Sequence, residues 1–172
     1  MILETRRLRL RDWRETDRAA LAAMHADPEV MADYRRIFTR IESDVRLDRY
    51  AASFKRHGLG RWALETLAGD FLGYVGIMPS WPEHPLAPHT EIGWRLVRRA
   101  WGHGYATEAA RAALADAFGR VGLDEVLAYT APDNLRSQAV MARLQLRRDP
   151  ERDFTARLDG IDYPSLVWVA AQ

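Results

Sequence analysis

The chain has 172 residues, contains no cysteine and carries a formal net charge of +1. This length is typical of one domain, so we expect residues 1–172 to form a single unit. Without cysteine there is no thiol nucleophile, disulfide or thiolate metal site. The sequence has no apolar run that could cross a bilayer, no secretory signal and no excess charge for nucleic acid. We therefore expect a cytoplasmic protein without membrane or nucleic-acid partners.

Hydrophobic periodicity and turn residues predict alternating strands and helices in the first half of the chain. The predicted elements are a strand at 2–10, a helix capped by Thr16 that runs through Met24, a helix beginning near Ser43, and strands at 61–67 and 71–78. The last two are joined by residues 68–70 and are expected to form an antiparallel hairpin. Four prolines between 79 and 88 then predict a loop.

The second half continues the pattern and predicts a mixed α/β fold with one layered sheet flanked by helices. The predicted elements are a strand at 89–97, an alanine-rich helix at 105–118 ended by Gly119, a strand at 124–130, a helix at 134–144 capped by Asp133 or Asn134, and strands at 147–157 and 161–170 around a turn at 159–160.

The segment between the strand at 89–97 and the helix at 105–118 contains two glycines, Gly102 and Gly104. Free N–H groups and the dipole at a helix start attract anions, and glycine lets a phosphate approach the backbone. Ordinary turn geometry also explains such a pair of glycines. A dinucleotide-binding fingerprint is disfavoured, because its third glycine is replaced by Thr107. Lys55 is the only lysine, which excludes a Walker A loop.

Three segments together resemble the GNAT superfamily of acetyltransferases, in particular its ribosomal-protein alanine N-acetyltransferase branch. They are Glu91-Ile92-Gly93-Trp94-Arg95-Leu96, Trp101-Gly102-His103-Gly104-Tyr105-Ala106 and Pro132-Asp133-Asn134-Leu135-Arg136-Ser137. The resemblance implies a mostly antiparallel, twisted sheet of about seven strands. It also implies a splay between the fourth and fifth strands, which end at Val97 and Thr130. Trp101 replaces the polar residue that is usual at the start of the loop.

The resemblance further implies acetyl-CoA as cosubstrate and assigns residues to it. The backbone of Trp94, Arg95 and Leu96 is expected to pair with the pantetheine arm. The loop from Trp101 through Gly102, His103, Gly104 and Tyr105 to Ala106 is expected to hold the pyrophosphate. Asn134 and Ser137 are expected to face the thioester.

The implied reaction moves an acetyl group directly to a primary amine, since no cysteine can carry it. Glu91 is the candidate base and a backbone N–H of Leu96 the candidate oxyanion donor. Many relatives place a proton-donating tyrosine where Met141 stands, so Ser137 is the candidate acid. The alternative is a catalytically inactive, CoA-binding or regulatory protein with the same fold.

The acceptor is predicted only as an amine, on a protein N-terminus or a small molecule. Its pocket is expected near the loop at 79–89 and the segment around Asp33-Tyr34. Five aromatic residues could line it and stay unassigned: Trp13, Tyr34, Trp81, Phe154 and Tyr163. His103, between two glycines, is disfavoured as a base, and no metal site is expected, because His84 and His89 lack suitable spacing. A second copy of the chain is a candidate partner.

Overall fold

The computed structural model describes residues 2–158 and 160–172. Its strands are β1 (Ile2–Glu4), β2 (Leu8–Arg11), β3 (Arg61–Thr66), β4 (Phe71–Pro79), β5 (Thr90–Leu96), β6 (Glu125–Thr130), β7 (Arg147–Arg148), β8 (Phe154–Leu158) and β9 (Ile161–Ala171). Its α-helices are α1 (Asp17–His25), α2 (Arg40–His57), α3 (Tyr105–Asp116) and α4 (Leu135–Arg143). Short 3-10 helices lie at Ala32–Tyr34, Arg98–Ala100 and Pro150–Arg152. Among the described residues, no helix combines the length and apolarity needed to cross a membrane.

The strands form one mixed sheet in the order β1-β2-β3-β4-β5-β6-β9-β7, with β8 paired to β9. Among the described strands, every pairing is antiparallel except that of β5 with β6. The predicted mixed α/β, GNAT-like fold, with a mostly antiparallel sheet and flanking helices, is therefore confirmed. The strand count is higher than the predicted seven because two predicted strands are each split in two.

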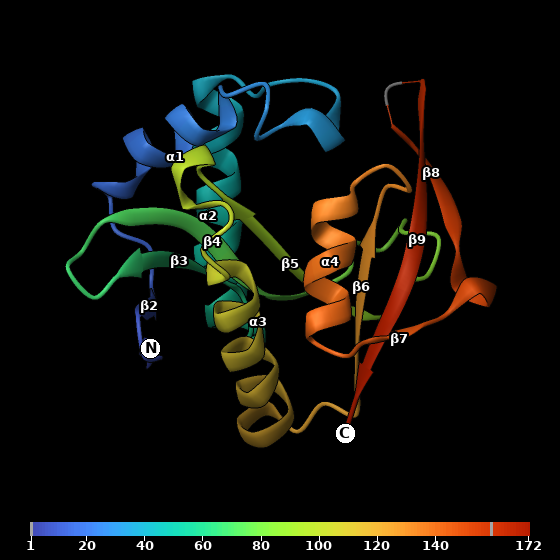
Figure 1. The fold of residues 1–172 in the computed structure, drawn as a ribbon. Helices are drawn as coiled ribbons and strands as arrows, with labels where there is room; N and C mark the ends of the chain where they lie inside the picture. The colour runs from blue at the N-terminus through green and yellow to red at the C-terminus, as the bar shows by residue number, and fades with distance from the viewer. Residues whose placement is uncertain (1, 159) are drawn as a thin grey trace.

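The sheet opens between β5 and β6, as predicted. These parallel strands share a single register pair, Glu91 with Leu127, and then diverge (Figure 1). The carboxyl half of β5 consequently pairs with β4 on one side and leaves its other edge open.

Helices cover both faces of the sheet because the side chains of β4 alternate between two cores. Val75 and Ile77 pack with the alanines of α3, whereas Tyr74 and Met78 pack with α1 and α2. Figure 1 shows α3 in front of the central strands and α2 behind them. The small alanine side chains of α3 let its backbone lie close to the sheet.

The prediction of one strand at 2–10 was wrong, because the chain turns at residues 5–7 and β1 folds back on β2. Thr16 occupies the N-cap position of α1, as predicted, but its side chain makes no capping hydrogen bond. Helix α2 begins three residues earlier than predicted, where Thr39 and Glu42 form a capping box.

The predicted end of the third helix at Gly119 was wrong too, since the chain continues through a π-helical turn to Gly122. The predicted strand at 147–157 is interrupted by Asp149 and the 3-10 helix at Pro150–Arg152, because proline cannot donate to a strand ladder. Of the predicted turn at 159–160, residue 159 lies outside the described residues.

Candidate active site

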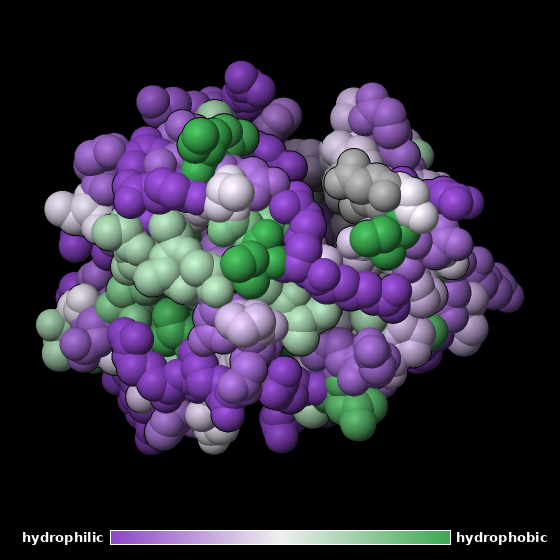
Figure 2. Space-filling model, turned by 90° about the horizontal axis from the view of Figure 1, so that it is seen from above, coloured by the Kyte–Doolittle hydropathy of each residue, from purple (hydrophilic) through white to green (hydrophobic). Residues whose placement is uncertain are grey.

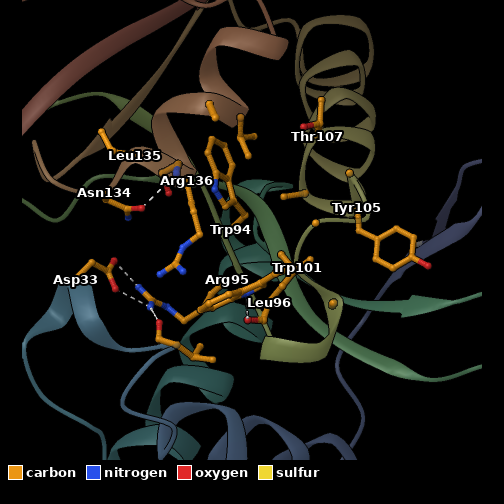
Figure 3. A pocket seen from close by; sticks show the side chains of 18 of the residues that line it. Asp33, Trp94, Arg95, Leu96, Trp101, Tyr105, Thr107, Asn134, Leu135 and Arg136 are labelled. Carbon is orange, nitrogen blue, oxygen red and sulfur yellow. Dashed lines mark hydrogen bonds and ion pairs between the residues drawn. The ribbon is translucent and has the colours of Figure 1, made fainter.

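A cleft of about 930 Å3 opens where β5 and β6 diverge, and the starts of α3 and α4 form its sides (Figure 3). We call it the donor cleft. This volume is within the range of cofactor sites. The lining side chains come from within residues 29–33, 94–96, 100–107, 133–137 and 139–143.

The loop before α3 forms a backbone cradle for an anion. Gly102 and Gly104 adopt φ angles of 79° and 76°, which favour glycine. Gly104 occupies the N-cap position and provides no side-chain cap. The first helical hydrogen bond runs from Glu108 N–H to Gly104 O. Within the described chain, the N–H groups of residues 105–107 donate to no acceptor, so they are available to a phosphate.

Two side chains in the first turn of α3 differ in their relation to this cradle. Thr107 lines the cleft, and its Oγ1 is buried without a partner in the described structure. The carboxylate of Glu108 is directed elsewhere, since it accepts hydrogen bonds from Thr5 Oγ1 at 2.7 Å and Arg7 Nε at 2.7 Å. Burial would raise the pKa of Glu108, but these hydrogen bonds outweigh burial and lower it. An orphaned hydroxyl and free N–H groups together fit a phosphate-bearing ligand.

Trp101 lines the donor cleft. Its Nε1 donates to Leu96 O at 3.0 Å, which ties the loop to the end of β5. Arg98 and Arg136 place their guanidinium carbons 5.2 Å and 4.0 Å from the indole. Figure 3 shows Arg136 reaching from α4 toward Trp101. An aromatic ring at this position therefore contacts two arginines, of which Arg136 lines the cleft.

The open edge of β5 presents backbone groups to the cleft. Val97 N–H donates to Leu72 O on β4 at 2.9 Å. Because backbone groups alternate along a strand, those of Leu96 and Trp94 face the open edge and those of Arg95 face β4. The expected backbone contacts thus fit Trp94 and Leu96, whereas the geometry does not favour Arg95 for this role.

The side chain of Arg95 has a structural partner instead. It forms a bidentate pair with Asp33, with both N–O distances at 2.7 Å. Burial alone would lower the pKa of Arg95, but the charges of Tyr74 and Asp33 raise it well above its usual value. Arg95 thereby fixes the 3-10 helix at Ala32–Tyr34 beside the donor cleft.

Helix α4 begins at the far wall of the cleft. Of the two predicted caps, Asn134 is the one used, since its Oδ1 accepts a hydrogen bond from Ser137 N–H at 3.2 Å. The cap engages only the backbone of Ser137, so the hydroxyl is available for other contacts. Ser137 lines both the donor cleft and a second, adjoining cavity.

This second cavity, which we call the acceptor cavity, has a volume of about 410 Å3. It shares six lining residues with the donor cleft: Ala32, Asp33, Trp94, Arg95, Asp133 and Ser137. The two spaces therefore meet at the middle of β5 and the start of α4. Four of the five unassigned aromatic residues line the acceptor cavity, namely Tyr34, Trp81, Phe154 and Tyr163. Trp13 instead donates to Arg61 O from the core.

Glu91 lines the acceptor cavity from β5. Its Oε1 accepts a hydrogen bond from Arg61 Nη2 at 2.6 Å, and both side chains are largely buried. Tyr129 lies on the neighbouring strand β6. Burial, followed by the charge of Glu91, raises the pKa of Tyr129, so the phenol keeps its proton. Met141 is buried and lines the same cavity.

The structure thus gathers most of the predicted residues around the two spaces. His103 lines the donor cleft but not the acceptor cavity that contains Glu91, and its exposed ring stacks on that of Tyr105 with 5.3 Å between the ring centres. Sequence reasoning missed Arg61, Thr107, Tyr129, Arg136 and Arg143, whose positions depend on long-range packing. Among residues 2–158 and 160–172, no group of three or more His, Asp or Glu side chains could hold a metal.

Comparisons with known proteins agree with this geometry. The profile of the family described as "Acetyltransferase (GNAT) domain" matches residues 7–147. The uncharacterised protein YkkB of Bacillus subtilis (strain 168) is 33% identical over 144 residues, which cover 83% of each chain. An Aspergillus fumigatus FsC-acetyl coenzyme A-N(2)-transacetylase is 34% identical over 147 residues, which cover 81% of this chain and 62% of that protein.

Solved structures show the same architecture. An acetyltransferase from Agrobacterium tumefaciens superposes with a TM-score of 0.84 at 29% identity, covering 100% of this chain and 95% of the other. A ribosomal-protein-S5-alanine acetyltransferase from Vibrio fischeri shares the fold with a TM-score of 0.77 at 16% identity, covering 99% and 96% of the two chains. The chain belongs to the GNAT family of acetyltransferases, which are acetyl-CoA-dependent acyltransferases.

Proposed function

We propose that this protein is an N-acetyltransferase that moves an acetyl group from acetyl-CoA directly to a primary amine. The observation that carries the proposal is the junction of the two spaces. The phosphate cradle lies in the donor cleft, Glu91 lies in the acceptor cavity, and Ser137 lines both. A donor held in one space and an amine held in the other would meet beside β5 and α4.

The donor cleft supplies groups suited to each part of acetyl-CoA. The N–H groups of residues 105–107 and the hydroxyl of Thr107 would hold the pyrophosphate. Arg136 and Arg143 add positive charge at the same cleft. The backbone groups of Trp94 and the carbonyl of Leu96 would bind the pantetheine amides in the manner of an added strand. When bound, acetyl-CoA supplies a thioester whose carbonyl carbon can be attacked by an amine.

The chain's own residues would move the protons. An alkylammonium has a pKa near ~10.4, so Glu91 would take its proton, directly or through water. The N–H of Leu96 would hold the developing oxyanion, because it faces the open edge of β5. Ser137 would return a proton to the sulfur. Since the sequence has no cysteine, the acetyl group would pass directly between the two substrates.

A catalytically inactive CoA-binding protein is the second candidate. It is favoured by Met141, which stands where many relatives have a proton-donating tyrosine. A thiolate is a good leaving group, with a thiol pKa of about 8.5, so loss of a strong acid would slow the reaction without abolishing it.

The cytoplasmic location and the homodimer stay predictions.

Two measurements test the proposal. Acetyl-CoA should raise the thermal midpoint of the protein, while ATP and NAD should not. Thiol release from acetyl-CoA should then depend on an added amine, and the absence of cysteine removes any background from the protein. An equal thermal response to all three ligands would contradict the proposed donor site. Acetyl-CoA binding without thiol release for any amine or short peptide would favour the inactive candidate.

A further inference from the structure

The acceptor cavity is rich in positive charge. Six arginines line it, against three acidic residues: Arg35, Arg36, Arg46, Arg49, Arg61 and Arg95 against Asp33, Glu91 and Asp133. Two arginines are neutralised within the cavity, because Arg61 pairs with Glu91 and Arg95 with Asp33. Arg36 pairs with Glu42, which does not line the cavity. Arg35, Arg46 and Arg49 against Asp133 still give the space a net positive character before any substrate enters.

Arg46 and Arg49 are one helical turn apart on α2 and carry most of this excess. The guanidinium carbon of Arg46 lies 4.0 Å from the ring centre of Phe38 and 5.3 Å from that of Tyr34. Neither arginine forms an ion pair with a carboxylate among residues 2–158 and 160–172. Arg46 is partly buried, and its partners are the Tyr34 and Phe38 rings and the uncharged Tyr50 hydroxyl, so no carboxylate of the described chain offsets its charge. An anionic ligand would reduce the cost of burying this cation.

The charge of Arg46 shifts the pKa values of its neighbours His25 and Tyr50. Burial, followed by the charges of Arg95 and Arg46, lowers the pKa of His25 to about 3. His25 is therefore neutral and adds no charge to this side of the fold. Burial raises the pKa of Tyr50, and the charges of Arg61 and Arg46 act in the opposite direction.

We infer that the acceptor is a small amine that also carries a carboxylate, which Arg46 and Arg49 bind. This inference rests on the proposed function and names its substrate class. The amine would lie beside Glu91, and the carboxylate would lie beyond Arg61, whose guanidinium is between Glu91 and the Tyr50 ring. A cavity of about 410 Å3 accommodates a molecule of amino-acid size.

The same charges disfavour polycationic acceptors. A polyamine or an aminoglycoside would bring further positive charge into a cavity that already has an excess of arginines. The view from above shows hydrophilic residues over much of the surface, a weakly hydrophobic area left of its centre and strongly hydrophobic residues in separate small patches (Figure 2).

The test compares matched pairs of amines in the thiol-release assay. Each ω-amino carboxylate of increasing length is paired with its amide, and a diamine of similar length is included. A peptide with an acidic second residue is paired with the same peptide in which that side chain is an amide. This pair tests whether the carboxylate belongs to a peptide or to a free amino acid. At least one carboxylate should exceed its amide about tenfold in kcat/KM. Equal values within every pair would overturn the inference.

Variants on α2 test whether Arg46 causes the preference for amines that carry a carboxylate. Arg46→Gln should reduce the carboxylate preference to about threefold or less, and Arg46→Lys should retain part of it. Arg56→Gln is the matched control, because Arg56 is exposed on the same helix and does not line the cavity. Thermal midpoints establish that each variant is folded. A loss of preference in Arg56→Gln as large as in Arg46→Gln would contradict binding by Arg46.

A binding measurement separates this inference from the proposed function. Glutarate, a dicarboxylate without an amine, should raise the thermal midpoint of the wild type but not of Arg46→Gln. If no amine is acetylated while glutarate still gives this difference, the proposed function fails and the anion site stands. If amines are acetylated without charge preference and glutarate has no effect, the inference fails and the proposed function stands.

Discussion

Arg61 on β3 donates a hydrogen bond from Nη2 to Oε1 of Glu91 on β5, at a distance of 2.6 Å. The pair crosses β4, which lies between these two strands in the sheet. It holds the carboxylate of Glu91, the one acidic residue of β5, at the wall of the acceptor cavity. The position of the candidate base is therefore set by a buried arginine from a distant part of the sequence.

Glu91→Gln should lower kcat for amine acetylation by about 10²-fold or more, because the amide cannot accept the proton. The amide can still accept the hydrogen bond from Arg61, so the fold and the affinity for CoA should change little. Glu125→Gln is the matched control, since Glu125 also pairs with an arginine but lines neither cavity. Unaltered rates of Glu91→Gln from about pH 6 to about pH 9 would remove Glu91 from the mechanism.

Ser137→Ala should slow acetyl transfer by about tenfold near pH 7, with a smaller effect above a pH of about 8.5, where the released thiolate needs no proton. Helix α4 should keep its cap, because Asn134 uses the backbone N–H of Ser137. Ser165→Ala removes another hydroxyl of the acceptor cavity and serves as control. A pH profile of Ser137→Ala parallel to that of the wild type would argue against proton donation by this hydroxyl.

Gly104→Ala should weaken CoA binding by more than about tenfold and destabilise the protein by roughly 1–2 kcal/mol, because an added Cβ strains a residue at φ 76°. Gly122 has the same φ of 76°, with nothing within 4 Å of an added Cβ, and it lies outside both cavities. Gly122→Ala should therefore reproduce the loss of stability without the loss of affinity. Equal CoA affinities in the two variants, measured by calorimetry, would show that the loop is not the phosphate site.

Thr107→Val should leave the stability of the free protein unchanged or slightly raised, because it removes a buried hydroxyl that lacks a partner. CoA binding should weaken by about tenfold if this hydroxyl contacts the phosphates. Thr107→Ser keeps the hydroxyl and should bind nearly as the wild type does. Thermal midpoints with and without CoA measure both effects, and wild-type stabilisation of Thr107→Val by CoA would exclude the contact.

The stability of the protein should depend on His25 in mild acid. Its folded-state pKa of about 3 lies below the unfolded value of 6.5, mainly because the side chain is buried. As the pH falls below about 6.5, the unfolded state gains a proton that the folded state cannot, and unfolding becomes easier by about 1.4 kcal/mol per pH unit. His25→Asn should reduce this slope between about pH 6.5 and 5 in urea titrations.

The exposed His57 provides the control for this measurement. His57→Asn should retain the slope of the wild type, because its side chain is in solvent. An identical slope in wild type and His25→Asn would show that His25 does not couple folding to protonation.

Local signals in the sequence predicted the elements that frame the donor cleft. The glycine pair before α3 and the cap of α4 both depend on residues close in the chain. The prediction failed where a turn or a cap interrupts a run of suitable residues, as at residues 5–7, at Thr39 and at Pro150. In each of these places, one short local structure outweighed the periodicity of its neighbours.

The acceptor cavity could not be assembled from sequence spacing. Glu91 was predicted from a family pattern, but Arg61, Arg46 and Tyr129 come from three other elements that only the folded sheet and α2 bring together. The partners of an arginine also depend on tertiary contacts. Arg98 and Arg99 precede the loop in sequence, yet neither lines the donor cleft, because Arg98 pairs with Glu29 and Arg99 donates to Phe71 O.

The central claim is direct acetyl transfer to an amine, and product analysis by mass spectrometry tests it most directly. Acetyl-CoA and the preferred amine should yield free CoA and N-acetylated amine in equal amounts, while the mass of the protein stays unchanged. Thiol release that no amine accelerates, or an acetylated form of the protein that passes its acetyl group to the amine, would contradict the account.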